Sequence, residues 1–293
     1  MKPITKKHFI RRTLGWIITL STIYVVFILA LGAMQGKFLY FPDRVKFVPD
    51  QWALKEMQPL IATTEDGLTL TSWYYPPKKP DKFTIVFFQG NAGHLGYRNY
   101  KVRPWLSAGY GVLMIGYRGF GNPGTPSEEG LYMDARAAID SLRAKGLPDK
   151  AFVFYGESLG TGVATQMATE YDASGLILES PYTSIPDVAA ARYPMVPAHL
   201  LLRDKYDSLS KIKDVHMPLL IMHGERDQVI PVKFGHMLLD AANEPKQGEF
   251  IPNADHNDVY DMRIQQLVLN FIDKLPTDPL LQSGLKKQEP VKP

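Results

Sequence analysis

The chain has 293 residues, of which 45% are hydrophobic and 22% charged, and its formal net charge is only +3. This is the composition of an ordinary globular protein, and the length allows one large α/β domain or two small ones. No basic patch outside the N-terminus points to a nucleic-acid partner, and the absence of cysteine excludes disulfides, cysteine metal sites and a cysteine nucleophile.

The N-terminus has the character of a membrane anchor. Residues 13–36 contain no charged side chain, and their apolar part, 14–34, is long enough as a helix to cross the roughly 30 Å hydrocarbon core of a bilayer. A cleaved signal peptide is the alternative, because 30–32 (Ala-Leu-Gly) resembles a cleavage site, although the apolar region of signal peptides is usually only about 7–15 residues long. We therefore interpret residues 1–36 as a basic N-terminus and a transmembrane helix.

The charges around this segment predict its orientation. Five basic residues precede the apolar stretch: Lys2, Lys6, Lys7, Arg11 and Arg12. Positively charged flanks tend to stay in the cytoplasm. We expect a single-pass anchor with a cytoplasmic N-terminus. The rest of the chain then lies outside the cytoplasm, in the periplasm of a bacterium or in a lumen of a eukaryotic cell.

After the anchor, a proline-punctuated connector at 37–59 leads into alternating strand and helix patterns. The predicted strands are 61–64, 68–74, 83–88, 111–115, 151–155, 175–178, 218–222 and 248–251. The predicted helices are 94–107, 127–145, 159–171, 232–242 and 258–275. Strands that are continuous apolar runs and alternate with helices indicate the α/β class, with a mostly parallel central sheet and helices on both faces. The pattern makes 37–275 one domain, followed by a polar tail at 276–293 that we expect to be disordered.

A candidate nucleophile lies at the end of one of these strands. Residues 156–160 (Gly-Glu-Ser-Leu-Gly) fit the G-x-S-x-G motif, in which a sharp strand-to-helix turn lifts the serine hydroxyl above the sheet. The two glycines allow the strand and the helix to approach closely. A phosphate-binding loop is the rival interpretation, but Val163 stands where its lysine should be. We therefore predict Ser158 as the nucleophile.

A serine nucleophile needs a base held in place by a third group, and in this type of fold the chain order is Ser, then Asp or Glu, then His. Asp227 lies in the loop after the strand at 218–222, at the sheet edge where ligands bind in α/β folds. His256 is the last histidine and lies in a loop before the final long helix. We predict a Ser158–His256–Asp227 triad. The other histidines after the nucleophile are expected to be structural or on the surface: His199, His216, His223 and His236.

Acyl transfer also requires donors for the negative charge that develops on the carbonyl oxygen. The backbone N–H of Leu159, directly after the nucleophile, is one predicted donor. The second should come from the loop at 89–93 (Gln-Gly-Asn-Ala-Gly), where we choose the N–H of Asn91 over those of Gly90 and Ala92.

Several further motifs accompany the triad. They are 90–93 (Gly-Asn-Ala-Gly), 116–121 (Gly-Tyr-Arg-Gly-Phe-Gly), 124–130 (Gly-Thr-Pro-Ser-Glu-Glu-Gly), 179–184 (Glu-Ser-Pro-Tyr-Thr-Ser) and 223–227 (His-Gly-Glu-Arg-Asp). This set resembles the α/β-hydrolase superfamily. Within it, the set resembles the membrane-anchored bud-emergence homologue family of abhydrolase-domain proteins and serine-aminopeptidase-like domains. The family usually has His-Gly before the Asn-Ala pair, and this chain has Gln89 instead; a glutamine can still hydrogen-bond to the loop.

Together the motifs predict a membrane-anchored serine hydrolase that cleaves an ester, thioester or small amide through an acyl-enzyme, without cofactor or metal. The resemblance implies a small acyl substrate or an acylated protein or peptide as its partner. A peptidase for short peptides is a second hypothesis, which an acidic pocket residue that binds a substrate amine would favour; Glu157 and Glu179 are placed near the site. A non-catalytic, membrane-tethered binding module is the third. Between Pro181 and Met217 we expect one irregular segment without a large cap, with apolar residues that line an acyl pocket or pack against the core.

Overall fold

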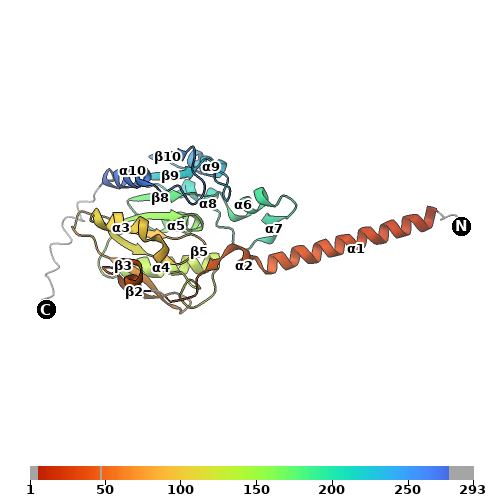
Figure 1. Cartoon of the computed structure of the whole chain (residues 1–293), viewed down its shortest axis with the longest axis horizontal. Helices are drawn as coiled ribbons and strands as arrows, with labels where there is room; N and C mark the ends of the chain where they lie inside the picture. The colour runs from red at the N-terminus through yellow and green to blue at the C-terminus, as the bar shows by residue number, and fades with distance from the viewer. Residues whose placement is uncertain (1–5, 47, 277–293) are drawn as a thin grey trace.

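The computed structural model describes residues 6–46 and 48–276. The predicted tail at 276–293 therefore lies outside the described residues apart from Pro276, and so does Lys2. Within the described chain, packed strands and helices form a rounded domain from which one long helix projects (Figure 1).

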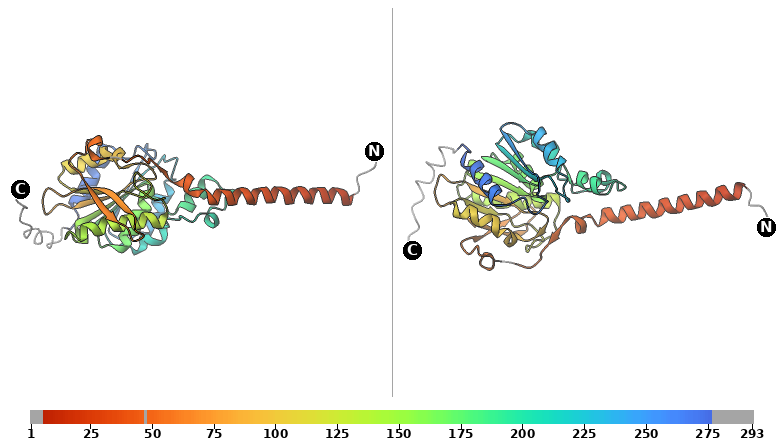
Figure 2. Two further views of the ribbon diagram at one scale, coloured as in Figure 1. Left: turned by 90° about the horizontal axis from the view of Figure 1, so that it is seen from below. Right: turned by 45° about the horizontal axis from the view of Figure 1, so that its top comes forward.

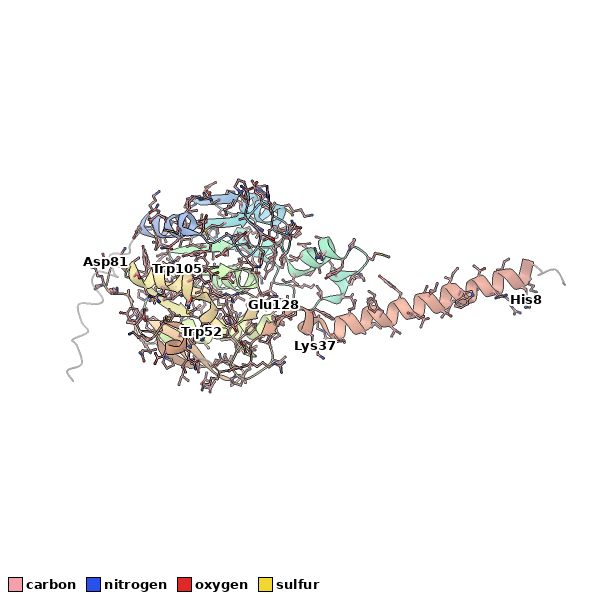
Figure 3. The ribbon with its side chains drawn as sticks, in the orientation of Figure 1. His8, Lys37, Trp52, Asp81, Trp105 and Glu128 are labelled. Atoms are coloured by element: carbon pink, nitrogen blue, oxygen red, sulfur yellow. The ribbon has the colours of Figure 1, made fainter. Side chains whose placement is uncertain are left out.

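This projecting helix is α1 (Lys6–Ala33). Its stretch Ile10–Ala33 is long and apolar enough to cross a membrane and is almost entirely exposed, although its end nearest the domain contacts the segment after β8. Figure 3 shows His8 near the far end of the helix and Lys37 where the chain enters the domain. The predicted anchor segment is thus one continuous helix and not part of the globular core.

A central sheet organises the domain. The strands of the protein are β1 (Phe41–Pro42), β2 (Gln58–Thr63), β3 (Thr69–Tyr75), β4 (Thr84–Phe88), β5 (Ala92–Gly93), β6 (Gly111–Met114), β7 (Phe152–Glu157), β8 (Gly175–Glu179), β9 (Leu219–Gly224) and β10 (Lys246–Ile251). Eight of them form one sheet in the order β10-β9-β8-β7-β4-β6-β3-β2. The strands from β10 to β6 run parallel, while β3 and β2 are antiparallel to their neighbours. The predicted mostly parallel sheet is confirmed.

Helices cover both faces of this sheet (Figure 2). After α1 they are α2 (Gln35–Leu39), α3 (Asn99–Ser107), α4 (Glu128–Arg143), α5 (Leu159–Glu170), α6 (Ile185–Arg192), α7 (Ala198–Leu201), α8 (Ser208–Lys211), α9 (Lys233–Ala241) and α10 (Met262–Asp273). Short 3-10 turns are η1 (Pro49–Trp52), η2 (Leu95–Arg98), η3 (Asp149–Ala151) and η4 (Ile212–Asp214). One core holds the buried residues of α4, α5 and α9, and the other holds those of α3 and α10.

The strands are continuous apolar runs because both of their faces are covered. In β4, Val86 and Phe88 belong to one core, while Ile85 and Phe87 belong to the other. Side chains of a strand alternate between the two faces of its sheet, so each face of β4 receives apolar residues. This arrangement leaves only the ends of the strands free to carry polar groups.

Some predicted boundaries were wrong for identifiable local reasons. The segment after Gly93 starts with η2 before α3, so it is not one helix from 94. The last helix begins at Met262 and not at 258, because the Asp261 side chain accepts a hydrogen bond from the Ile264 N–H, 2.8 Å away, and so caps it there. The segment between β8 and β9 was expected to be irregular, yet it contains α6, α7 and α8. As predicted, this segment holds no large cap domain.

Candidate active site

Ser158 occupies the turn between β7 and α5. Its backbone has φ 52° and ψ −119°, a strained combination for a residue with a side chain. A β-carbon at Gly156 would collide with the backbone of Thr161, and one at Gly160 would collide with the backbone of Phe88. Both positions therefore require glycine. The strained turn is thus held by close backbone packing on both sides, which presents the serine side chain at the carboxyl end of the sheet.

The three predicted triad residues come together at this edge. Ser158 Oγ lies 2.9 Å from His256 Nε2, and His256 Nδ1 lies 2.7 Å from Asp227 Oδ2. With its Nδ1–H donating to the carboxylate, the neutral imidazole directs the lone pair of Nε2 at the serine hydroxyl. This geometry allows His256 to accept the serine proton.

Asp227 is fixed by more than His256. Its Oδ1 accepts hydrogen bonds from the backbone N–H groups of Val229 (2.8 Å) and Ile230 (2.7 Å). Its Oδ2 also lies 3.2 Å from Nε2 of His223, a fully buried side chain. Burial by itself would raise the pKa of Asp227, but the hydrogen bonds with His223 and His256 outweigh it and hold the pKa well below its usual range. The carboxylate therefore stays ionised, and His223 has a part at the site that sequence reasoning missed.

A buried cluster of four charges lies directly beside Ser158. The Lys101 ammonium is 2.6 Å from Glu157 Oε2 and 2.7 Å from Glu179 Oε2, and its side chain is only 1% exposed. Arg98 Nη2 lies 2.7 Å from Glu157 Oε1. Burial raises the pKa of Glu157, yet the two cations more than offset this and bring it to about 2. Two cations thus balance two carboxylates, and neither Lys101 nor Arg98 was foreseen from the sequence.

This cluster is also tied to the nucleophile through the main chain. The Ser158 N–H donates to the Glu179 carbonyl oxygen over 2.9 Å. The Tyr155 hydroxyl donates to Glu179 Oε2 over 2.5 Å. Because Glu157 precedes the nucleophile and Glu179 binds its backbone, the ionic cluster stabilises the two strand ends that hold the strained turn.

A cavity of about 220 Å³ opens beside Ser158 and His256. Its other walls include the charged cluster, the aromatic rings of Tyr97 and Tyr100, and the Ser180 side chain. Small-molecule sites commonly measure about 300–1,000 Å³. The cavity is thus polar and small, and it suits a short group next to the reacting carbonyl.

The loop predicted to complete the oxyanion hole lies next to the nucleophile. A β-carbon at Gly90 would be 3.5 Å from Ser158 Cβ. The Asn91 side chain donates to the Leu39 carbonyl over 2.8 Å, and its own carbonyl accepts from the Phe41 N–H over 2.8 Å, so the chain that follows α1 holds this loop. Leu159 is the first residue of α5, where helix N–H groups are free to bind anions. The assignment of the Leu159 and Asn91 N–H groups to an oxyanion hole stays a prediction.

Gln89 replaces the family's usual histidine, and a glutamine at this position could hydrogen-bond to the loop, but it does not do so here. Its side chain is fully buried, and within residues 6–46 and 48–276 its amide nitrogen and oxygen have no hydrogen-bond partner. The loop is instead held by Asn91, through its contacts with the segment after α1.

The remaining histidines lie away from the site. His236 stacks on Phe250 with ring centroids 3.7 Å apart. His199 Nε2 lies 3.4 Å from Asp187 Oδ1, and its side chain is largely exposed. His216 Nδ1 is 3.4 Å from the Asn243 side-chain nitrogen. None of the three lines the cavity beside Ser158.

Sequence relatives cover most of the chain. Residues 79–206 match the family described as serine aminopeptidase, S33. Protein Rv2307c of Mycobacterium tuberculosis is 36% identical over 234 residues, which is 79% of this chain and 83% of that protein. Protein YfhR of Escherichia coli is 32% identical over 237 residues, or 77% of this chain and 81% of that protein. Both relatives are named only as uncharacterized proteins.

Solved structures share the fold at lower identity. The esterase Pf2001 of Pyrococcus furiosus superposes with a TM-score of 0.65 at 21% identity, over 81% of this chain and 97% of that one. An alpha-beta hydrolase of Vibrio vulnificus gives a TM-score of 0.64 at 21% identity, over 79% of this chain and 88% of that one. At this identity, the similarities show that the proteins share a fold.

Proposed function

Because this chain belongs to the α/β-hydrolase superfamily, as its sequence motifs predicted, we propose that it is a membrane-anchored serine hydrolase with Ser158 as nucleophile, His256 as base and Asp227 as orienting acid. One observation carries this proposal. The hydrogen-bonded path from Ser158 Oγ through His256 to the ionised Asp227 begins at a strained turn that presents the serine next to a cavity. Its substrate is an ester or thioester.

The geometry supports a two-step reaction. Ser158 Oγ attacks the acyl carbonyl carbon while its proton passes to His256 Nε2. The bond from the carbonyl carbon to the leaving oxygen or sulfur then breaks, and the leaving group takes that proton. Water attacks the acyl-enzyme, gives a proton to Nε2 and releases the carboxylic acid, and the proton returns to Ser158 Oγ. Asp227 stays ionised throughout and stabilises the imidazolium.

Two backbone donors would stabilise the tetrahedral intermediates. We assign them to the N–H groups of Leu159 and Asn91. The position of Leu159 at the start of α5 supports the first, because a helix N-terminus favours negative charge. The closeness of Gly90 to Ser158 supports the second, because it brings the Gly90–Asn91 peptide to the nucleophile. Loss of one such donor typically costs about 10²–10³ in kcat.

The charge balance of the cavity favours an ester or thioester over a short peptide. An aminopeptidase has to bind the ammonium group of its substrate, which calls for an unpaired carboxylate. The carboxylates that line this cavity, those of Glu157 and Glu179, are both occupied by Lys101. Arg98 takes the remaining oxygen of Glu157. A substrate amine would have to displace these cations.

The anchor belongs to the same proposal. Helix α1 would cross the membrane once with its basic end in the cytoplasm and the hydrolase domain on the opposite side, in the periplasm of a bacterium. The length and apolar surface of Ile10–Ala33 support a membrane crossing, and the basic residues that precede it support this orientation. A cleaved signal would leave a mature chain that begins near residue 33. N-terminal sequencing of the membrane-bound protein distinguishes an uncleaved anchor from a cleaved signal peptide, because only the anchor retains the residues before Leu14.

A fluorophosphonate probe tests the hydrolase assignment on the full chain in mild detergent. We expect the probe to label the native protein and Ser180→Ala but not Ser158→Ala. Ser180 is the matched control, because its side chain lines the same cavity and its backbone also has a positive φ, 51°. p-Nitrophenyl esters of increasing acyl length then define the pocket, and we expect short chains to react best. A folded native protein that takes no label would move the binding-module hypothesis to first place.

A further inference from the structure

The segment between β8 and β9 lies along the anchor helix. We call residues 185–203, which contain α6 and α7, the α6–α7 hairpin. At its tip, the Met195 carbonyl accepts a hydrogen bond from the Tyr24 hydroxyl over 2.6 Å. At its base, the Arg203 N–H donates to Gln35 Oε1 over 2.8 Å. Figures 1 and 2 show the hairpin projecting from the domain on the side of α1. The hairpin therefore runs back along the end of α1 that is nearest the domain.

Between these two points the packing is close. A β-carbon at Gly32 would lie 3.3 Å from Leu201 Cδ2, so the small residue lets the Leu201 side chain approach the helix. Contacts thus follow α1 from Tyr24 to Gly32 and continue to Gln35 at the start of α2. The tip of the hairpin lies at the level of residues that belong to the apolar stretch Ile10–Ala33.

The hairpin exposes large apolar side chains instead of burying them. The exposed fractions are 60% for Tyr193, 82% for Met195 and 88% for Leu200. The sequence had suggested that these residues line an acyl pocket or pack against the core, and they do neither. Single exposed apolar residues are common, but a group of them next to a long apolar helix marks an interaction surface.

The backbone of the hairpin is also suited to an apolar solvent. Two of the ten residues at 193–202 are prolines, which leaves eight N–H groups, and six of these eight donate to carbonyl oxygens within the hairpin. The donors belong to Tyr193, Val196, Ala198, Leu200, Leu201 and Leu202. Backbone polar groups without partners cost several kcal/mol each in hydrocarbon, so a loop enters it only when its own bonds are made. The hydrogen bond from Tyr24 satisfies the Met195 carbonyl as well.

The charges of the hairpin match the surface of an anionic bilayer. The hairpin's one acidic side chain, Asp187, lies 3.4 Å from His199, and the remaining charged side chains, Arg192 and Arg203, are both basic and exposed. Long basic side chains place their apolar stems in lipid and their charged ends among the headgroups. Basic residues near the surface attract anionic lipids.

We propose that the α6–α7 hairpin enters the same leaflet as the domain-proximal end of α1, so that the protein contacts the bilayer at two points. This inference rests on the proposed transmembrane role of α1. Nine residues separate Tyr24 from Ala33, which corresponds to roughly 13 Å along a helix. One leaflet contributes about 15 Å of hydrocarbon. The tip at Met195 therefore stays within a single leaflet, and Arg192 and Arg203 reach the headgroups.

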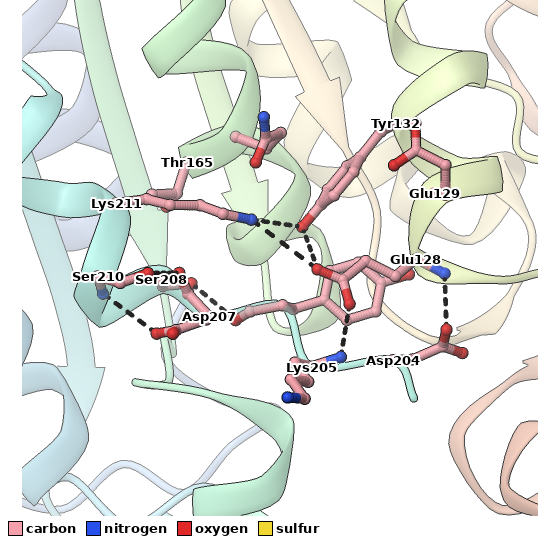
Figure 4. Close-up of polar contacts among 12 residues, drawn as sticks. Glu128, Glu129, Tyr132, Thr165, Asp204, Lys205, Asp207, Ser208, Ser210 and Lys211 are labelled. Carbon is pink, nitrogen blue, oxygen red and sulfur yellow. Dashed lines mark hydrogen bonds and ion pairs between the residues drawn. The ribbon is translucent and has the colours of Figure 1, made fainter. Parts of the chain in front are cut away.

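The base of the hairpin is joined firmly to the domain (Figure 4). Glu128 Oε2 accepts from the Lys205 N–H over 2.5 Å, and the Glu128 N–H donates to Asp204 Oδ1 over 3.1 Å. The Tyr132 hydroxyl and the Lys211 ammonium extend this network into α4 and α8. A hairpin held in lipid would therefore fix the orientation of the whole domain.

That orientation turns the active-site edge of the sheet toward the membrane. The chain leaving α1 pairs at once with the loop beside the nucleophile, since Phe41 of β1 pairs with Ala92 of β5. The hairpin itself starts shortly after Ser180, which lines the cavity. Both membrane contacts thus approach the edge that carries Ser158, and an ester dissolved in the bilayer would reach the site along a short path.

The absence of native cysteine allows a direct test with single cysteines in the full chain. We would prepare Met195→Cys at the hairpin tip, Leu20→Cys on α1 and Asp81→Cys, which Figure 3 places at the end of the domain far from α1. Each variant carries an environment-sensitive fluorophore and is placed in nanodiscs of phosphatidylcholine and phosphatidylglycerol. Quenching by a nitroxide-labelled lipid is compared with quenching by aqueous iodide.

We expect the labels at positions 195 and 20 to be quenched by the nitroxide lipid and protected from iodide, with the reverse for position 81. If iodide quenches the label at position 195 as strongly as the label at position 81, while the label at position 20 is in lipid, the hairpin inference is wrong and the anchor proposal still stands. Protection at 195 from both quenchers would mean that a second copy or another protein covers the tip, which also overturns it. A label at position 20 that stays in water would refute the anchor itself.

Discussion

The buried Lys101 offers the sharpest test of how the nucleophile is held in place. In Lys101→Met, Glu157 keeps its bonds to Arg98, at 2.7 Å and 3.0 Å, but Glu179 keeps only the Tyr155 hydroxyl. Removing one partner from a buried ion pair costs about 3–5 kcal/mol, because the remaining charge stays buried without compensation. Since small domains are stable by about 5–15 kcal/mol, this loss is a large share of the total.

Urea unfolding followed by tryptophan fluorescence measures this loss, and Lys150→Met is the matched control. Lys150 lies 2.5 Å from Asp172, but the two side chains are 39% and 76% exposed. A pair this exposed contributes at most about 1 kcal/mol. An equal loss of stability in the two variants would refute the idea that the buried cluster stabilises the active-site turn.

The pH dependence of stability tests the same cluster independently. In the native protein the pKa of Glu157 is lowered to about 2, so its contribution to stability is present above the unfolded value of about 4.3 and is lost as the pH falls below it. Without Lys101 the buried carboxylates are easier to protonate, and protonation relieves the uncompensated charge. The difference in free energy of unfolding between the native protein and Lys101→Met should therefore shrink as the pH falls from about 5 toward about 3; a difference that grows over this range would contradict the argument.

Three further predictions concern the nucleophile and its partners. Asp227→Asn should lower kcat by about 10⁴-fold. Because the native pKa of Asp227 is depressed, the difference in free energy of unfolding between the native protein and this variant, measured by urea titration, should become smaller as the pH falls below about 4. His223→Leu removes the imidazole whose Nε2 lies 3.2 Å from Asp227 Oδ2. The apparent pKa of the acidic limb in the plot of kcat/KM against pH should rise, with little change in KM. An unchanged apparent pKa would mean that His223 has only a structural role. Gly160→Ala should prevent folding, seen as loss of soluble protein, because its β-carbon would meet the Phe88 backbone. In the control, Gly146→Ala, the β-carbon meets no atom within 4 Å, so only the strain of the positive φ of 94° remains and the loss of stability should be far smaller.

Much of the fold, and the three side chains of the candidate site that lie together at the sheet edge, could be predicted because their signals are local. Buried parallel strands are apolar on both faces, as β4 and β7 are, and such runs stand out against the polar loops. Ser158 lies in a motif whose first glycine is required by the backbone of Thr161 in the turn and whose second is required by the backbone of Phe88 at the end of β4. Asp227 and His256 could be assigned because each follows a strand at the carboxyl edge of the sheet.

The contacts that could not be predicted join distant parts of the chain. Lys101 meets Glu179, which lies 78 residues further on, and no sequence pattern marks a lysine that will be buried. The sequence allowed Gln89 to hydrogen-bond to its own loop, but the segment after α1 holds that loop instead, through a contact between residues 52 positions apart. The apolar residues of the α6–α7 hairpin were expected to line an acyl pocket or to pack against the core, and their exposure could not be predicted because composition alone does not show which surface an apolar segment meets.

The acyl-enzyme itself is the most direct test of the central claim. The full chain in mild detergent would be mixed with a p-nitrophenyl ester, quenched in acid within the first turnover and digested for mass spectrometry. We predict a burst of nitrophenol and an acyl group on the peptide that contains Ser158, both absent in Ser158→Ala. Hydrolysis that continues unchanged in Ser158→Ala, or an acyl group on any other residue, would contradict the assignment.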